Sequence, residues 1–451
     1  MNINTLTLAD LAAPVANAIV GGPFGSNLVS KDYVPTGVPV IRGQNMGNKW
    51  VTGNFVFVSP EKASQLAANK ARPGDLVFTQ RGTLGQVSIV PAGSYSEYVV
   101  SQSQMKITPD PNKADVNFLY YLFKTEEQQK YILNAAIQTG VPHTNLGILR
   151  KTPVSLPSVS TQRQIAVVLS AFDDRIDLFH ETNVTLEAIA QALFRSWFVD
   201  FDPVREKAEG REPEGLDAEV SGLFPSSFEE SQLGPMPGGW KVSTLVEHIR
   251  AERGLSYKGA GLCSAEEGRP MHNLNSVYEG GGYKYPGIKF YKGDFKDRHI
   301  VRAGDIIVTN TEQGHEHRLI GFPAVVPEAY DNGIFSHHLY RLTIRSESPL
   351  TRQVLYYLLM SPNVREQVIG CANGSTVNML KIHGMEIPRF VCPPATIARA
   401  FEDLTLPLRK QIELNVARAQ ALMTVRDVLL PKLISGRIRL TEAEALIREA
   451  A

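Results

Sequence analysis

The chain has 451 residues, a formal net charge of zero at pH 7, 43% hydrophobic residues and 20% charged residues. This length predicts two or three domains, and the composition is ordinary for a globular, core-forming protein. The cysteines, Cys263, Cys371 and Cys392, are odd in number and form no CxxC pair. This pattern argues against a disulfide framework and against a thiolate metal site.

The start of the chain, MNINTLTLADLAAP, has no basic stretch ahead of an apolar run, and no apolar run reaches transmembrane length. We therefore expect a cytoplasmic protein with no membrane contact. Residues 1–158 and 231–393 are mildly basic, and the acidic stretch 200–230 cancels them. A mildly basic block supports nucleic-acid binding only weakly, because most such surfaces are simply solvated.

The chain contains an internal repeat with a very long period. RPGDLVFTQRGTLGQVSIVP (72–91) is followed by FLYYLFKTEEQQKYI (118–132) and QTGVPHTNLGILRKTPVSLP (138–157). Their echoes are RAGDIIVTNTEQGHEHRLIGFPAVVP (302–327), VLYYLLMSPNVREQVI (354–369) and CANGSTVNMLKIHGMEIPRFVCPP (371–394). Each half therefore encodes the same β-rich globular domain, and each half closes with a helix.

Both closing helices carry apolar residues at alternating spacings of three and four, which is typical of a coiled coil, although a long core helix is the plain alternative. The expected seam of the first helix is Ile165, Leu169, Phe172, Ile176, Phe179, Asn183, Leu186, Ala190, Leu193 and Trp197. The expected seam of the second is Ile397, Phe401, Leu404, Leu408, Gln411, Asn415, Arg418, Leu422, Val425 and Leu429. Asn183 falls on Asn415 in this register, and a seam asparagine fixes helix alignment at a cost in stability.

These elements predict an α+β protein in which two globular α/β domains alternate with two long helices. The helices would pair as an antiparallel coiled coil, which gives a pseudo-twofold internal repeat. In chain order we expect a first globular domain (1–158), a first helix (159–203), an acidic linker (204–232), a second globular domain (233–393), a second helix (394–436) and a C-terminal tail (437–451).

A search for catalytic motifs is negative. GGPFGS (21–26) lacks the spacing of a P-loop or of GxGxxG, so a turn is the better interpretation. His315, Glu316 and His317, with the pair His337–His338, lack the spacing of a metal site. No G-x-S-x-G elbow is present, nor the Asn- or Asp-Pro-Pro-aromatic tetrapeptide of amino-methylating DNA enzymes. We therefore expect no catalytic residue, no metal and no cofactor in this chain.

The residues resemble the specificity (S) subunit of type I restriction–modification systems over nearly the whole chain. The most specific stretches are QRQIAVVLSAFDDRIDLFHETNVTLEAIAQALFRSWFVDFDP (162–203) and LLPKLISGRIRL (429–440). GPFGSNLVSKDYVPTGVPVIRGQNM (22–46), RPGDLVFTQRGTLGQ and LGPMPGGWK support the resemblance.

The resemblance implies that the globular domains are target recognition domains, each reading one half of an interrupted, asymmetric DNA target. The helices would act as a ruler for the unread gap. Partners would be double-stranded DNA, two methyltransferase (M) subunits and restriction/translocase (R) subunits. S-adenosylmethionine would be bound by the M subunit, which would methylate adenine N6.

Loops are expected to carry the base-reading side chains, because Arg, Asn, Gln and His supply the hydrogen-bonding groups that match major-groove edges. The candidates in the first domain are Arg42, Gln44, Asn45, Thr79, Gln80, Arg81, Thr83 and His143. Those in the second domain are Asn310, Thr311, Gln313, His315, His317, Arg318, His337 and His338. For each of them a solvated loop side chain, or a strand end for Thr79, remains the alternative.

The resemblance also implies that M subunits dock on the helices. The expected docking residues are the aromatic tip of the first helix, Phe194, Trp197, Phe198 and Phe201, and the end of the second, Leu429, Leu430 and Leu433. Two other functions stay open: a self-sufficient DNA-modifying enzyme, and a coiled-coil scaffold with two heads that bind ligands other than DNA.

Overall fold

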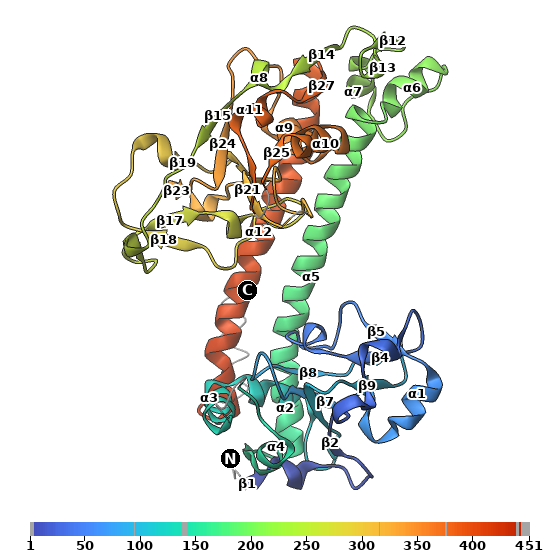
Figure 1. Cartoon of the computed structure of the whole chain (residues 1–451), viewed down its shortest axis with the longest axis vertical. Helices are drawn as coiled ribbons and strands as arrows, with labels where there is room; N and C mark the ends of the chain where they lie inside the picture. Colours follow the sequence, from blue (N-terminus) through green and yellow to red (C-terminus); the bar gives the residue numbers. More distant parts are fainter. Residues whose placement is uncertain are drawn as a thin grey trace. The chain divides into compact units, whose positions relative to one another are not determined.

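The computed structural model describes residues 4–93, 95–137, 142–314, 316–374, 377–438 and 442. The chain forms two compact units: unit 1 comprises Met1–Leu178 and Arg418–Ala451, and unit 2 comprises Phe179–Ala417. The chain leaves unit 1 within one long helix, α5 (Val159–Phe198), and returns within another, α12 (Ala395–Ile434) (Figure 1). Each unit therefore holds one globular domain together with a part of both helices.

Unit 1 contains a four-stranded antiparallel sheet, ordered β2-β10-β7-β8, and a five-stranded sheet, ordered β3-β5-β4-β9-β6. A third pairing joins β1 to β11. The strands are β1 (Asn4–Thr7), β2 (Ile19–Gly21), β3 (Tyr33–Val34), β4 (Val38–Ile41), β5 (Val56–Val58), β6 (Lys70–Ala71), β7 (Leu76–Thr79), β8 (Val87–Ile89), β9 (Tyr98–Val100), β10 (Gln104–Ile107) and β11 (Pro153–Leu156). The short helices are α1 (Pro60–Gln65), α2 (Val116–Lys124), α3 (Glu126–Ala135) and α4 (Leu146–Lys151).

Unit 2 repeats this topology. Its four-stranded sheet is ordered β15-β24-β20-β22, its five-stranded sheet β16-β18-β17-β23-β19, and β14 pairs with β27. The strands that form these sheets are β14 (Lys241–Thr244), β15 (Ile249–Arg253), β16 (Leu262–Cys263), β17 (Arg269–His272), β18 (Lys289–Tyr291), β19 (Ile300–Val301), β20 (Ile306–Thr309), β22 (Pro323–Val325), β23 (Gly333–Phe335), β24 (Leu339–Ile344) and β27 (Arg389–Cys392). The remaining strands are β12 (Phe228–Ser231), β13 (Gly234–Pro237), β21 (Thr311–Gln313), β25 (Ala372–Asn373) and β26 (Val377–Leu380). Its short helices are α6 (Asp202–Ala208), α7 (Ala218–Leu223), α8 (Leu245–His248), α9 (Arg352–Met360), α10 (Pro362–Gly370) and α11 (Ile382–Glu386).

The equivalence extends to strand direction and to individual turns. Each five-stranded sheet has one parallel pair, β4 with β9 and β17 with β23. The Arg-x-Gly-Asp motifs form the same turn, because the backbone amides of Arg72 and Arg302 each donate to the aspartate three residues later at 2.8 Å. The sequence repeat is therefore a repeat of structure.

The cores follow directly from the apolar runs. All four residues of β7 and of β20 are buried, which explains why these strands lack polar alternation. The tyrosine-containing helices α2 and α9 cover the sheets, and each begins at a capping side chain, Asp115 and Thr351 respectively. A fully buried Leu, Ile or Phe contributes about 1.5–3 kcal/mol, so these layers supply most of the stability of each unit.

The two long helices pair in opposite directions. In unit 2, Asn183 of α5 meets Asn415 of α12, whereas Phe194 meets Phe401 with ring centroids 5.8 Å apart. Every seam position expected on α5 is buried or half-buried, which confirms that part of the prediction.

The predicted seam of α12 is wrong at three positions. Leu404, Gln411 and Arg418 are exposed, whereas their neighbours Thr405 and Ala419 are buried and Ile412 is half-buried. Positions that belong to both the predicted and the observed seam, such as Phe401, Leu408 and Asn415, are predicted correctly. From them the real seam advances by four and then three residues rather than by three and then four.

The segment expected to be an acidic linker (204–232) contains folded structure. Helices α6 and α7 and strand β12 lie in it, and Val204 and Phe224 are buried in the core of unit 2. The linker-like composition comes largely from exposed acidic residues between α6 and α7, namely Glu209, Glu212, Glu214 and Asp217.

Candidate nucleic-acid interface

The same edge of the four-stranded sheet carries the polar loops of both units. In unit 1, the amide of Gln80 donates to the carbonyl of Ser103 at 2.7 Å, and the amide of Thr144 donates to the carbonyl of Gln80 at 2.9 Å. In unit 2, the amide of Asn310 donates to the carbonyl of His338 at 3.0 Å, and that of Leu380 to the carbonyl of Asn310 at 2.8 Å. Three segments far apart in the sequence are thus joined in the same way twice. We call each of these assemblies a polar edge.

A glycine holds the turn of each polar edge against its sheet. A Cβ added to Gly22 would lie 1.9 Å from the carbonyl oxygen of Ser101, and one added to Gly254 would lie 2.3 Å from that of Ser336. Any other residue would push the backbone away from the turn. The glycine-rich stretch GGPFGS therefore serves close backbone packing.

The candidates in unit 1 differ in access to solvent. Gln44, Arg81 and Thr83 are exposed, and Arg42, Gln80 and His143 are half-buried. Of these, Gln80, Arg81 and His143 share the polar edge, since Arg81 and His143 form an antiparallel bridge. Thr83 follows in the same loop.

Asn45 and Thr79 have structural roles. Asn45 is 1% exposed, accepts from the amide of Arg42 at 3.1 Å and donates to the carbonyls of Thr52 and Asn54. Thr79 is 3% exposed and donates to the side chain of Gln86. Neither side chain can reach a base edge without unfolding its turn, so the structure contradicts both assignments.

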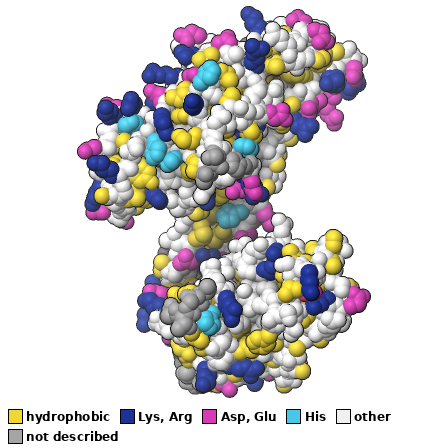
Figure 2. All heavy atoms as spheres, in the orientation of Figure 1, with side chains coloured by type: hydrophobic (Ala, Val, Ile, Leu, Met, Phe, Trp, Pro, Cys, Tyr) yellow, Lys and Arg dark blue, Asp and Glu magenta, His cyan; other side chains and the backbone are white. Residues whose placement is uncertain are grey.

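In unit 2, Gln313 and Arg318 are exposed, and His317, His337 and His338 are half-buried; His315 lies outside the described residues. Histidine side chains reach the surface of unit 2 on the face drawn in Figure 2. Asn310 and Thr311 are 1% and 5% exposed, so they are not free to read bases either.

The buried pair instead supports the histidines. Asn310 Nδ2 donates to the carbonyl of His337 at 3.0 Å, and Thr311 Oγ1 lies 3.2 Å from His338 Nδ1. The rings of His337 and His338 are 3.9 Å apart. Burial, followed by coulombic repulsion from the neighbouring His337 and Arg253, lowers the pKa of His338. The His338 ring is therefore neutral at pH 7 and can accept a hydrogen bond as well as donate one.

Two residues of the polar edges, Gln102 and Arg253, are not among the base-reading residues predicted from the sequence. Gln102 is half-buried in the turn of unit 1, at the position that His337 occupies in unit 2. Arg253 is exposed beside that second turn, where its Nε donates to the carbonyl of His337 at 3.1 Å. Aligning the strands β10 and β24 would have revealed Gln102, whereas the position of Arg253 depends on the pairing of β15 with β24.

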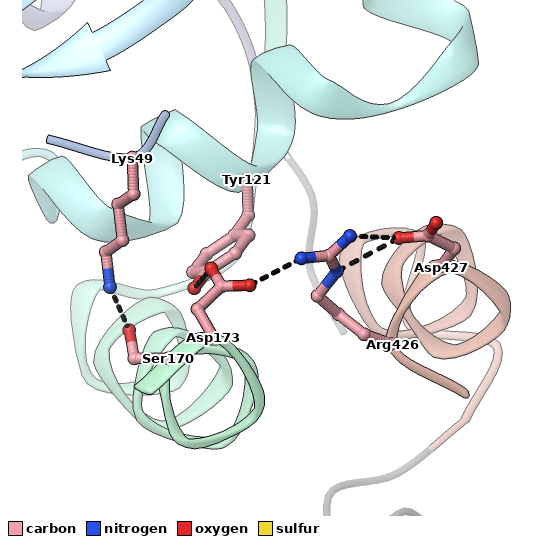
Figure 3. Close-up of polar contacts among 6 residues, drawn as sticks. All are labelled: Lys49, Tyr121, Ser170, Asp173, Arg426 and Asp427. Carbon is pink, nitrogen blue, oxygen red and sulfur yellow. Dashed lines mark hydrogen bonds and ion pairs between the residues drawn. The ribbon is translucent and has the colours of Figure 1, made fainter. Parts of the chain in front are cut away.

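Each globular domain is tied to the long helices by a tyrosine, a carboxylate and an arginine. In unit 1, the Tyr121 hydroxyl donates to Asp173 of α5, which also accepts from Arg426 of α12 at 2.5 Å (Figure 3). In unit 2, Tyr356 lies 3.5 Å from Glu187 of α5, which pairs with Arg409 of α12 at 3.5 Å. Burial and the nearby Asp173 carboxylate raise the pKa of Tyr121, so its hydroxyl stays protonated and can donate. These junctions attach each globular domain to its part of the helix pair.

The residues predicted to dock M subunits are buried, which corrects that assignment. Phe194, Trp197 and Phe198 lie in the core of unit 2, with Trp197 only 1% exposed, and Phe201 packs against that core. Leu429, Leu430 and Leu433 lie in the core of unit 1. The aromatic tip therefore stabilises its own chain, with Phe201 half-buried beside the core.

Among the described residues, no group of three or more His, Cys, Asp or Glu side chains is arranged to hold a metal ion. Within the same part of the chain, every helix is too short or too polar to cross a membrane.

Comparisons with known proteins agree with this architecture. Residues 27–188 match the family model described as type I restriction modification DNA specificity domain. The MjaIX specificity subunit of a type I restriction enzyme from Methanocaldococcus jannaschii is 25% identical over 433 residues, which cover 94% of this chain and 92% of that protein. The HindI specificity subunit of a type I restriction enzyme from Haemophilus influenzae is 25% identical over 459 residues, which cover 90% of this chain and 95% of that protein. The crystal structure of a type I restriction–modification S subunit from M. genitalium shares the fold, with a TM-score of 0.54, 16% identity and 96% of each chain covered.

Proposed function

Because the chain belongs to the family of type I restriction–modification specificity subunits, we propose that it is the DNA-reading subunit of such a complex. It reads a bipartite, asymmetric DNA target with a fixed gap and directs adenine-N6 methylation or restriction by partner subunits. It has no catalytic role of its own.

One observation carries this proposal: the same polar edge is built twice with different side chains. Gln80, Gln102 and Ser103 in unit 1 stand where unit 2 has Asn310, His337 and His338. Asn310 is buried, so the contrast in reading groups rests on Gln102 and Ser103 against His337 and His338. Equivalent backbones with different hydrogen-bonding groups suit two half-sites of different sequence. Exposed Arg81 and Arg318 add charge for phosphates or guanines.

The helix pair is the proposed ruler. Two reading units on one stiff connection gain affinity only when the span between them matches both half-sites. The zero net charge of the chain is low for a protein that binds DNA alone, which favours partners that supply part of the phosphate contacts.

The outer faces of the long helices are the proposed docking surface for two M subunits. Val184 and Ile189 of α5 are 72% and 45% exposed in unit 2, and Val167 is 68% exposed in unit 1. Exposed apolar side chains on otherwise polar helices suit contact with a partner protein. S-adenosylmethionine would then bind to the M subunit, which must take the adenine out of the duplex, and R subunits would join that assembly in the cytoplasm.

Two alternatives predict different behaviour. A self-sufficient DNA-modifying enzyme would bind S-adenosylmethionine and methylate DNA alone. A scaffold with two heads for other ligands would form a complex with M subunits and mark no DNA.

The deciding experiment is methylome sequencing of a methylation-free host that expresses this chain with its M subunit, against each chain alone. N6-methyladenine at one interrupted, asymmetric motif, only with both chains, is the expected result. Methylation with this chain alone would favour the enzyme, and a stable but unmarked complex would favour the scaffold.

A further inference from the structure

Phe24 is the most exposed large apolar side chain in the described part of unit 1, at 83%. It stands between Pro23, whose ring restricts the backbone, and Gly25, which has a φ of +55°. Its neighbours Gly25, Ser26 and Asn27 are also exposed, so Phe24 is a single apolar group in a polar loop.

The loop that carries Phe24 is fixed at both ends. On one side, the amide of Gly22 donates to the carbonyl of Gln104 at 2.9 Å, and Gly22 packs against Ser101. On the other side, Leu28 is 1% exposed, and its carbonyl accepts from the side chain of Gln102. Phe24 is therefore presented on a short, anchored loop, which reduces the conformational entropy lost on binding.

The same contacts place the loop on the polar edge. Gln102 and Ser103 form the turn to which Gln80 is hydrogen bonded. A Cβ on Gly21 would lie 3.5 Å from Gln80 Oε1, so the loop begins beside that side chain. The exposed aromatic ring thus borders the residues proposed to read the first half-site.

Unit 2 has the loop but not the aromatic residue. Counting from the equivalent glycine, Gly254, the position of Phe24 is taken by Ser256, which is exposed. The next residue, Tyr257, is half-buried and packs against Tyr291 with ring centroids 5.9 Å apart. The contrast supplies a matched control position.

We propose that Phe24 is an apolar wedge that stacks against a base step in the half-site read by unit 1, and that the other half-site has no such wedge. This rests on the proposed function. A protein partner would be expected to cover a continuous apolar patch. A lone ring surrounded by hydrogen-bonding groups instead suits a DNA groove, where an apolar wedge can partly unstack a base step and pack on the base faces that this exposes. Base–aromatic stacking contributes about 1–3 kcal/mol, so loss of the ring should weaken specific binding roughly five-fold to 150-fold.

The test compares complexes of the M subunit with the wild-type chain, Phe24→Ala, Phe24→Trp and Ser256→Ala. The probe is a duplex carrying the methylated motif identified for the wild type, with 2-aminopurine placed at successive steps of the half-site read by unit 1. We expect Phe24→Ala to lose affinity by about five-fold or more and to lose the fluorescence change at one step. Phe24→Trp and Ser256→Ala should bind like the wild type.

Specific binding by Phe24→Ala within two-fold of the wild type, with an unchanged 2-aminopurine signal, would overturn the wedge while leaving the reading function intact. Loss of M-subunit co-purification in Phe24→Ala would overturn it in favour of protein docking. If the wild-type complex bound no motif in preference to a scrambled duplex, the proposed function itself would fail, and the wedge with it.

Discussion

The side-chain amide of Asn415 donates a hydrogen bond to Asn183 Oδ1 at 2.9 Å, joining α12 to α5 within unit 2. Gln411 Nε2 donates to Asn415 Oδ1 at 2.8 Å, and Asn183 Nδ2 donates to the carbonyl of Ile412 at 3.4 Å. This is a polar contact in an otherwise apolar seam, where polar pairs fix alignment rather than add stability.

Replacing one asparagine should therefore be worse than replacing both. Asn415→Leu alone leaves Asn183 Oδ1 without its donor and should lower the free energy of unfolding by about 1–3 kcal/mol. Asn183→Leu with Asn415→Leu should restore the thermal midpoint or raise it above that of the wild type. Circular dichroism melts of the four variants in the cycle measure this, and a double variant less stable than both single ones would contradict it.

Asp173 is the centre of the junction in unit 1, where it accepts from both Tyr121 and Arg426. Its side chain is 11% exposed, so Asp173→Ala leaves a partly buried guanidinium short of one partner. We expect Asp173→Ala to lower the free energy of unfolding by about 3 kcal/mol. Asp174→Ala is the control, since that neighbour is exposed, and equal midpoints for the two variants would show that the junction adds nothing.

Trp197→Ala should unfold unit 2 rather than release a partner. The ring packs on Phe224 and Phe401 with centroids 5.1 and 5.9 Å away, and removal of a buried tryptophan costs about 3–5 kcal/mol of stability.

Val184→Asp with Ile189→Asp should leave the melting temperature unchanged and weaken co-purification of the M subunit. The docking proposal would be abandoned if that exposed pair changed nothing.

The sequence predicted the repeat, the alternation of domains and helices, and the Asn183–Asn415 match, because these depend on local patterns that survive in one dimension. It misplaced Gln411 and Arg418, because a one-residue shift of the seam preserves half of the apolar positions. It also assigned Trp197 to a surface, since periodicity cannot say what a helix end packs against. The sequence also suggested Asn310 as a base contact, because the turn of His337 that binds its side chain is distant in the sequence.

His272 should make unit 2 acid-sensitive. The ring is fully buried beside Tyr283, at 2.9 Å, and burial lowers its pKa from 6.5 to about 4. Between these values the unfolded chain binds more protons than the folded one, so stability is complete above pH 6.5 and falls as the pH drops toward 4. The free energy of unfolding falls by about 3 kcal/mol in total as the pH drops from above 6.5 to below 4. Urea titrations at pH 7 and pH 5 should show about 2 kcal/mol of this loss. His272→Leu should reduce the difference, and an unchanged difference would assign the acid sensitivity to other groups.

Arg81 and Asn310 lie on the two polar edges, but their substitution should have different effects: loss of DNA binding for Arg81 and loss of stability for Asn310. Arg81 is exposed, so Arg81→Ala should leave the melting temperature unchanged and weaken binding of the methylated motif by about 1–3 kcal/mol. A base contact would relax specificity at one position, and a phosphate contact would reduce the salt dependence of binding instead. Asn310→Ala should lower the melting temperature, because its side chain holds the turn of His337. Arg72→Ala is the control, since Arg72 is exposed just before the opposite end of β7. If Arg72→Ala weakened binding as much as Arg81→Ala, the effect would reflect overall charge, and the polar edge of unit 1 would not be the reading surface.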